Sequence, residues 1–237
     1  MEEEMIKGLG RLRNATILAF LTVLLFQLPY VFFFPYRSLE RLPTSPSFIV
    51  IVMITMVLMI IGFILAIASW IFEILGWSSM CKAGMRKFYC VTKYVVLFGP
   101  IVGFLLAIVG AGALALEAIG KGVMPTEESL RSFLTGKILF YILPGLLVMV
   151  AVAVIAGVAS LDVGLLTNTR ILTVGALLYL ISVVLQAPAL LPSPEFTSFG
   201  LASGILSIPA LLLMAIGFHL ARRAVPHEAG REEAGTT

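Results

Sequence analysis

The chain has 237 residues, of which 60% are hydrophobic and 12% are charged. A soluble domain averages about 45–50% apolar and about 25% charged residues, so these values exclude an ordinary soluble fold and predict a membrane protein. The formal net charge of +3 arises in short connecting segments. No basic patch alternates with aromatic residues as single-strand binders require, so we expect no nucleic acid partner.

Six apolar runs are long enough to cross a bilayer as helices. A hydrocarbon core of about 30 Å needs about 20 apolar residues in an α-helix. The sequence therefore predicts an all-α integral membrane protein, a bundle of six transmembrane helices in a single domain over 1–221. We expect it in the cell membrane as a multi-pass protein. The predicted spans are roughly 15–35, 48–76, 94–119, 138–160, 171–192 and 200–221.

The second span leads into a stretch, WIFEILGWSSMCKAGMRKFYCVTKY (70–94), that holds most of the chemistry-bearing side chains. A helix that starts at residue 48 reaches Glu73 about 9 Å beyond the hydrocarbon core, near the headgroups. Trp70 and Trp77 then lie at the interface as belt residues. We interpret Glu73 chiefly as the carboxylate of an interfacial ion pair, with a functional intramembrane carboxylate as the alternative.

The loop after the second span is basic and contains both cysteines. Cys81 and Cys90 are too few for a disulfide framework. With His219 and His227 they could complete a zinc site, but their C-x8-C and H-x7-H spacings are unlike those of zinc sites, so we expect no metal or other cofactor. Acylation of Cys81 is a further alternative. Four basic residues are candidate contacts for anionic lipid headgroups, namely Lys82, Arg86, Lys87 and Lys93.

Basic residues are distributed unevenly between the two sides of the predicted bundle. Most of the 16 Lys and Arg residues lie in the N-terminal segment, the second and fourth loops and the tail. Cytoplasmic segments carry such an excess, so the sequence predicts that both termini are cytoplasmic. The polar tail over 222–237 is predicted to be disordered.

The third loop and the prolines suggest local irregularities. Residues 126–136 form a short amphipathic pattern, which predicts a surface helix capped by Thr126 and ended by Gly136. Proline interrupts five of the six predicted spans, which is common in transmembrane helices and also found in transporter sites. The prolines are Pro29, Pro100, Pro144, Pro188 and Pro209.

Small residues recur at a spacing that suits close helix packing. In lipid, helices approach each other through Gly, Ala and Ser rather than through larger apolar side chains. The predicted packing positions are Gly99, Gly103, Ala107 and Ala111 in the third span and Gly200 and Gly204 in the sixth. A similar Gly-containing pattern recurs near 76, 157 and 217 at the ends of the even spans, which is consistent with three stacked helical hairpins.

Three features together resemble a known family. They are MIKGLGRLRNATILAF (5–20), ILGWSSMCKAGMRKF (74–88) and the glycine-rich pair of late hydrophobic spans. They resemble an archaeal family of multi-pass membrane proteins that is catalogued as a domain of unknown function, number nine-seventy-three. The similarity covers most of the chain. That family carries no assigned activity, so the resemblance implies a membrane fold and gives no residue a role.

Two functional hypotheses follow from the sequence. The first is a non-enzymatic membrane component that binds lipids, such as anionic lipids, or other membrane subunits. The second is a small transporter or channel for an ion or small solute. Ion paths usually need an ionisable group near the middle of the bilayer, and the sequence places none there, which favours the first hypothesis. No serine pairs in sequence with a membrane histidine, so we expect no catalytic residue.

Overall fold

The structure is a computed structural model that describes residues 2–33, 46–120, 127–189 and 197–234. These residues form six α-helices, and no strand occurs among them, so the predicted all-α class is confirmed for the described chain. In chain order the helices are α1 (Glu2–Phe33), α2 (Pro46–Lys82), α3 (Lys87–Gly120), α4 (Glu127–Leu166), α5 (Arg170–Ala189) and α6 (Thr197–Ala234).

Five of the described helices contain a segment long and apolar enough to cross a membrane, which makes the chain a multi-pass membrane protein by length and composition. The apolar segment of α5, Arg170–Gln186, is shorter, so a sixth crossing stays a prediction. The five longer segments are Glu2–Gln27, Val52–Lys82, Lys87–Glu117, Leu143–Leu166 and Ala202–Val225.

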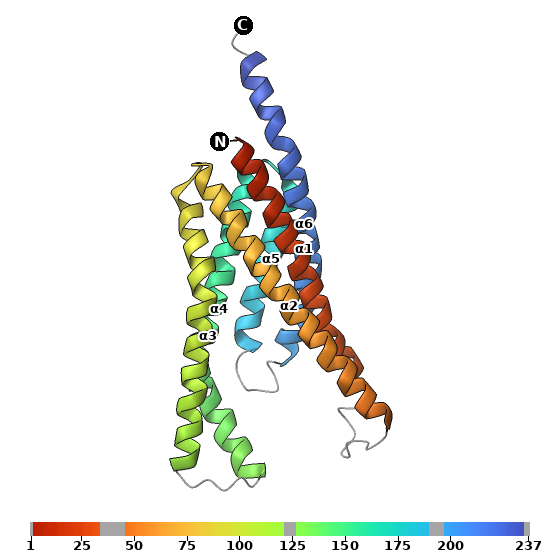
Figure 1. Ribbon diagram of the computed structural model, residues 1–237, viewed down its shortest axis with the longest axis vertical. Helices are drawn as coiled ribbons and strands as arrows, with labels where there is room; N and C mark the ends of the chain where they lie inside the picture. Colours follow the sequence, from red (N-terminus) through yellow and green to blue (C-terminus); the bar gives the residue numbers. More distant parts are fainter. Residues whose placement is uncertain (1, 34–45, 121–126, 190–196, 235–237) are drawn as a thin grey trace.

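Tight turns join the helices at the end of the molecule where both termini lie (Figure 1). Between α2 and α3, Gly84 has a φ of 71°, a left-handed conformation that glycine adopts without steric cost. Its backbone N–H donates to the carbonyl of Cys81 at 3.1 Å. Between α4 and α5, Asn168 takes the same role with a φ of 49°. These turns make the helices that they join antiparallel neighbours.

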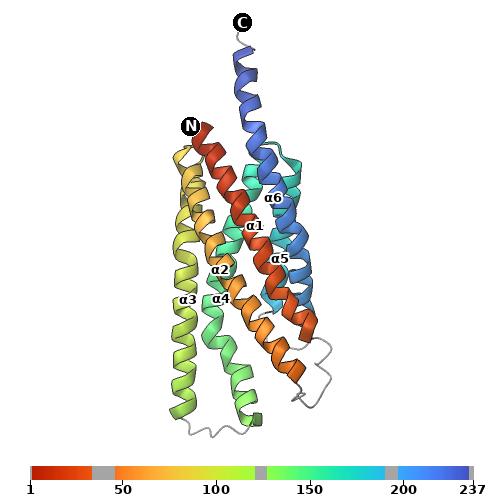
Figure 2. The same cartoon turned by 45° about the vertical axis from the view of Figure 1, so that its right-hand side comes forward.

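The six helices form a ring. Among the described residues, each helix contacts the next one along the chain, and α6 contacts α1 and so closes the circle. The backbones on opposite sides of the ring rarely come close, and their side chains meet in the buried core. The strongest contacts join α1 to α2, α5 to α6 and α3 to α4, and the predicted stacking of three hairpins stays a prediction. Figures 1 and 2 show these pairs side by side from two directions. A ring leaves room for a site along its axis.

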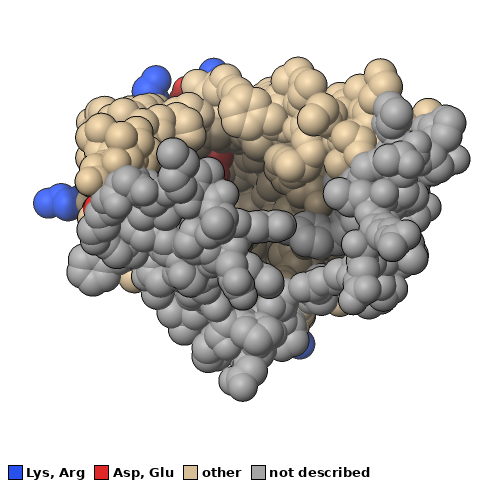
Figure 3. Space-filling view, turned by 90° about the horizontal axis from the view of Figure 1, so that it is seen from below, with Lys and Arg blue, Asp and Glu red and all other residues tan. Residues whose placement is uncertain are grey.

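The ring is tightly packed at one end and hollowed at the other. The buried core includes Leu9, Trp77, Tyr89 and Phe218, which lie toward the end with the termini. Seen from the opposite end, the described residues form one wall of a hollow (Figure 3). At that end, the N-terminal half of α2 exposes apolar side chains on more than one face of the helix. They are Met53, Ile54, Met56, Val57, Ile60, Phe63 and Ile64.

The predicted small-residue stripe of α3 packs against α4, with one correction. A Cβ on Gly99 would overlap the side chain of Val152, and one on Gly103 would lie 3.0 Å from the carbonyl oxygen of Gly145. Ala107 is half-buried, but Ala111 is exposed, and Gly110 takes its place against α4. At about 100° per residue, position 111 is rotated by about 120° from position 99, whereas position 110 is rotated by only about 20°.

The other predicted packing positions lie on α6. Gly204 is buried, and its missing side chain leaves space for the amide of Gln27 in α1. Gly200 is half-buried. The face of α2 that carries Gly76 packs on α1, because a Cβ on Gly76 would lie 2.7 Å from the side chain of Leu12. Small residues therefore mark the α1–α2 and α1–α6 contacts as well.

The prediction of a separate surface helix in the third loop is wrong. The surface helix of the third loop is the beginning of α4, which runs from Glu127 through Gly136 to Leu166, and Thr126 lies outside the described residues. One glycine weakens a helix by only about 1 kcal/mol, too little to end one of 40 residues. α6 extends as far as Ala234, and the predicted disorder of the tail stays a prediction.

The proline positions do not divide any helix into two. α3 continues through Pro100 and α4 through Pro144. Residues 29, 188 and 209 likewise lie within helical segments. Proline removes one backbone hydrogen bond, which a long helix in a bundle tolerates. Broken helices of the transporter type are therefore not found in the described chain.

Candidate functional site

A cavity of about 70 Å³ lies where five of the six helices meet. Helices α1, α2, α4, α5 and α6 all contribute to its wall. Most of the lining is apolar, as expected between membrane helices. The polar side chains that line it are Thr16, Ser69, Glu73, Trp77, Ser160 and Tyr179. A cavity of this size has room for a few water-sized groups.

Glu73 supplies the one carboxyl group among the cavity-lining residues. The indole N–H of Trp77, one turn along α2, donates to its Oε1 at a long 3.4 Å. The predicted interfacial ion pair is not formed in the described part of the chain, where the single ion pair joins Arg86 to Asp162. The reason is helix rotation: Glu73 lies between Ser69 and Gly76 on the face of α2 that packs against α1.

Three hydroxyl groups of the cavity each donate their proton to a backbone carbonyl. Ser69 of α2 donates across to the carbonyl of Ala15 in α1 at 2.8 Å. Thr16 and Ser160 each donate to the carbonyl four residues earlier in their own helix, at 2.8 and 2.9 Å. With its proton committed, each hydroxyl oxygen has only lone pairs left for a cavity occupant.

Trp77 lines the cavity one turn along α2 from Glu73. Its side chain is 1% exposed, and its ring stacks on that of Tyr89 with centroids 5.8 Å apart. The prediction that Trp77 is a membrane-interface belt residue is therefore wrong. Trp70 is half-buried and donates its indole N–H to the carbonyl of Val96 in α3 at 2.7 Å. Both tryptophans join α2 to α3, which the sequence pattern of α2 alone does not reveal.

Asp162 is a structural residue that the sequence analysis missed. Its carboxylate accepts a hydrogen bond from Arg86 at 2.6 Å and another from the Tyr89 hydroxyl at 2.8 Å. This connects the α2–α3 turn to the last turns of α4. The signal in the sequence was a single aspartate inside an apolar run, IAGVASLDVGL (155–165), which marks a partner elsewhere in the bundle.

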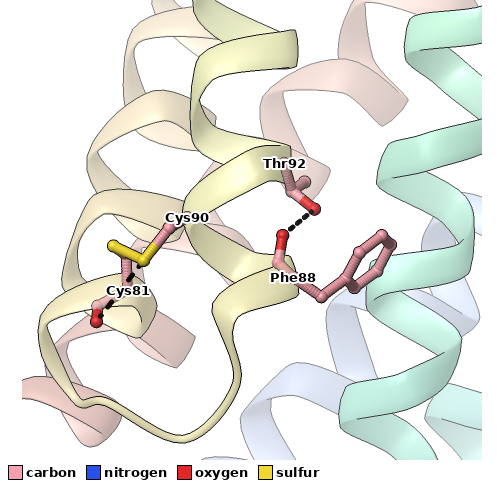
Figure 4. The surroundings of a disulfide bond; sticks show 4 residues. All are labelled: Cys81, Phe88, Cys90 and Thr92. Carbon is pink, nitrogen blue, oxygen red and sulfur yellow. Dashed lines mark hydrogen bonds between the residues drawn. A yellow bond between two sulfur atoms is a disulfide. The ribbon is translucent and has the colours of Figure 1, made fainter.

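The two cysteines form a disulfide that was not predicted. Cys81, near the end of α2, is bonded to Cys90 in the first turns of α3 (Figure 4). On the same stretch of α3, Thr92 donates to the carbonyl of Phe88 at 3.0 Å. The bonded sulfurs are unavailable for zinc or acylation. His219 contacts Arg13 through its Nδ1 at 3.3 Å, and the side chain of His227 lies outside the described residues.

The predicted headgroup contacts lie around the same turn. Lys82 and Lys87 are exposed. The ammonium of Lys93 lies over the ring of Tyr94, 5.2 Å from its centroid. Arg86 is 51% exposed but is paired with Asp162, so it has less freedom to contact a lipid phosphate than the lysines have.

The disulfide bears on the predicted orientation. Disulfides persist mainly in oxidising compartments, whereas the excess of basic residues assigns the same end of the bundle to the cytoplasm. The disulfide therefore favours an extracytoplasmic location for this end of the bundle, whereas the basic residues favour a cytoplasmic one. The orientation with both termini inside therefore stays a prediction, and it needs a test that takes the disulfide into account.

We expect Cys81 and Cys90 to react with a membrane-impermeant maleimide only after the membrane is opened and the disulfide is reduced. In sealed cells, an impermeant reductant followed by the maleimide should give no labelling. As a control, Gly120→Cys in a background without Cys81 and Cys90 should label in sealed cells, because position 120 is exposed at the other end. Labelling of the native pair in sealed cells after reduction would reverse the orientation.

Comparison with known proteins gives no relative: no protein-family model, curated protein or solved structure matches the chain. The resemblance to the domain of unknown function nine-seventy-three therefore stays a prediction. The chemistry of the site rests on its own geometry, a carboxyl group and three hydroxyl oxygens around one cavity inside a ring of apolar helices.

Proposed function

We propose that the protein is a small membrane transporter or channel whose solute passes along the axis of the helix ring and is held at the Glu73 cavity. From the sequence alone this function came second, because Glu73 was predicted to lie near the headgroups. The observation that carries the proposal is the carboxyl group of Glu73 on a cavity shared by five helices. An ionisable group facing the interior of a membrane bundle usually marks a solute or ion path.

Two features of the fold support this function. The helix backbones contact each other in sequence around a ring, so the polar side chains of the cavity face the interior of the bundle rather than its outer surface. At the end opposite the termini, the described residues form one wall of a hollow, and this is the end at which a solute would enter (Figure 3). At the other end the buried cluster around Trp77 and Phe218 closes the ring, so passage requires that cluster to move.

A lipid- or partner-binding membrane component is the second candidate. The lower half of α2 favours it, because apolar side chains such as Met53, Ile60 and Phe63 are more than 60% exposed there. Such a surface is covered by lipid or by another membrane protein. Lys82 and Lys87 would contact anionic headgroups at the opposite end. Neither function assigns a catalytic role to any residue.

Flux through proteoliposomes tests the proposed function. We expect vesicles containing the protein to take up a small labelled cation, or to dissipate a pH gradient, faster than protein-free vesicles. Glu73→Gln should reduce that flux to the protein-free level, since it removes the ionisable group and preserves the shape. Glu3→Gln makes the same change at an exposed position of α1 and should leave the flux unchanged. Equal flux with and without protein would reject the function.

A further inference from the structure

We infer that the Glu73 cavity binds one small monovalent cation, which takes the place of the carboxyl proton. The inference rests on the proposed function for its place in transport, but the binding itself is a separate property of the cavity. Its basis is the set of oxygen atoms around the cavity and the directions in which their protons point.

The cavity presents acceptors rather than donors. Ser69, Thr16 and Ser160 commit their hydroxyl protons to backbone carbonyls, so their oxygens have only lone pairs left for an occupant. The indole N–H of Trp77 is directed at Glu73. For an anion, the cavity therefore offers four side-chain acceptors, the three hydroxyl oxygens and the carboxyl of Glu73, and one remaining side-chain donor, the hydroxyl of Tyr179. A cation would find hydroxyl and carboxylate oxygens, which are the ligands that hard cations prefer.

Charge and size narrow the ligand to a small monovalent cation. One carboxylate balances one positive charge, and no group of three His, Cys, Asp or Glu side chains in the described chain could hold a metal ion, which disfavours a divalent cation. At about 70 Å³ the cavity accepts a bare or partly hydrated alkali cation or ammonium. Larger organic cations do not fit without movement of the helices.

Exchange with a proton follows from the cost of an isolated charge. A lone carboxylate among apolar helices is strongly disfavoured, so the site stays neutral in both of its states. In one state the carboxyl holds its proton. In the other, the O–H bond breaks, the proton passes to water, and the cation pairs with the carboxylate. Among the described residues that line the cavity, Tyr179 carries the other titratable side chain.

Thermal unfolding of the purified protein in detergent provides the test. Sodium, potassium and ammonium chloride are each compared with N-methyl-glucamine chloride at constant ionic strength. At mildly alkaline pH, we expect at least one of the small cations to raise Tm, and the rise should shrink at mildly acidic pH, where the proton competes. Glu73→Gln should lose the response and Glu3→Gln should keep it. Ser160→Ala should weaken the apparent affinity about fivefold to tenfold, since it removes one oxygen ligand.

A second measurement covers the case in which Glu73→Gln does not fold. In weakly buffered solution, adding the stabilising cation to the wild-type protein should release up to one proton per chain, and N-methyl-glucamine should release none. If no small cation differs from N-methyl-glucamine in either measurement, the cation site is wrong. A response that persists in folded Glu73→Gln would also overturn it. Cation binding without flux would reject the transport function alone, and flux without cation binding would reject this inference alone.

Discussion

Gly110→Ala should lower the thermal stability of the bundle more than any other single added methyl group on α3. A Cβ at this position would overlap the backbone carbonyl of Tyr141 in α4. A flexible side chain could move aside, but a carbonyl held in a helix cannot, so α3 and α4 must separate. Overpacking of this kind destabilises proteins by about 1–3 kcal/mol. Unfolding in detergent should show a Tm several degrees below that of the wild-type protein.

Gly112→Ala is the matched control, two residues further along the same helix. No atom lies within 4 Å of a Cβ at this position, and the residue is exposed. Because alanine favours a helix over glycine by about 0.5–1 kcal/mol, this change should leave Tm unchanged or raise it slightly. Equal Tm values for the two variants would mean that α3 and α4 do not approach each other at Gly110.

Asp162→Ala should destabilise the corner where α2, α3 and α4 meet. Tyr89 is completely buried, and its hydroxyl donates to Asp162 at 2.8 Å. Without that acceptor the buried hydroxyl is unpaired, at a cost of about 1–3 kcal/mol. Loss of the ion pair with Arg86 contributes less to the destabilisation than the unpaired hydroxyl does, because that arginine is 51% exposed and water screens the pair. Denaturation in mixed detergent measures the difference in free energy of unfolding between Asp162→Ala and the wild-type protein.

Two further variants separate these contributions. Asp162→Asn keeps an acceptor for Tyr89 and removes the charge, so it should cost no more than about 1 kcal/mol. Tyr89→Phe removes the hydroxyl that Asp162→Ala leaves unpaired. The double variant with Asp162→Ala and Tyr89→Phe should therefore lose less free energy of unfolding than the two single variants lose together. If Asp162→Asn were as damaging as Asp162→Ala, the ion pair rather than the buried hydroxyl would be the stabilising contact.

The sequence was a good guide where local interactions decide the outcome. Helix formation in an apolar run depends on hydrogen bonds between residues four apart, so the six runs and their approximate places follow from the sequence alone. The glycines of α3 were recognisable because close helix approach requires small residues. The pattern failed at Ala111 because a strict spacing of four drifts around a helix of 3.6 residues per turn, and this drift moved the contact to Gly110.

Helix ends were predicted less well for a related reason. The tail and the third loop contain residues that favour helices, and each prolongs a long helix whose first turns are already formed. Extending a helix adds one hydrogen bond per residue fixed, which is much easier than starting one. A polar composition therefore did not determine where α4 begins or where α6 ends.

By itself, the sequence determined a membrane protein of apolar helices with its basic residues concentrated in particular loops. The tertiary structure alone decided what the polar side chains do. Glu73 faces a shared cavity because of the rotation of α2 against its neighbours, and Asp162 meets Arg86 across 76 positions of sequence. Cys81 and Cys90 meet because the α2–α3 turn folds back on itself. The contacts of Glu73 and Asp162 join segments whose relative rotation and position depend on the packing of the whole ring, which no local pattern encodes, whereas the disulfide spans 9 positions around one tight turn.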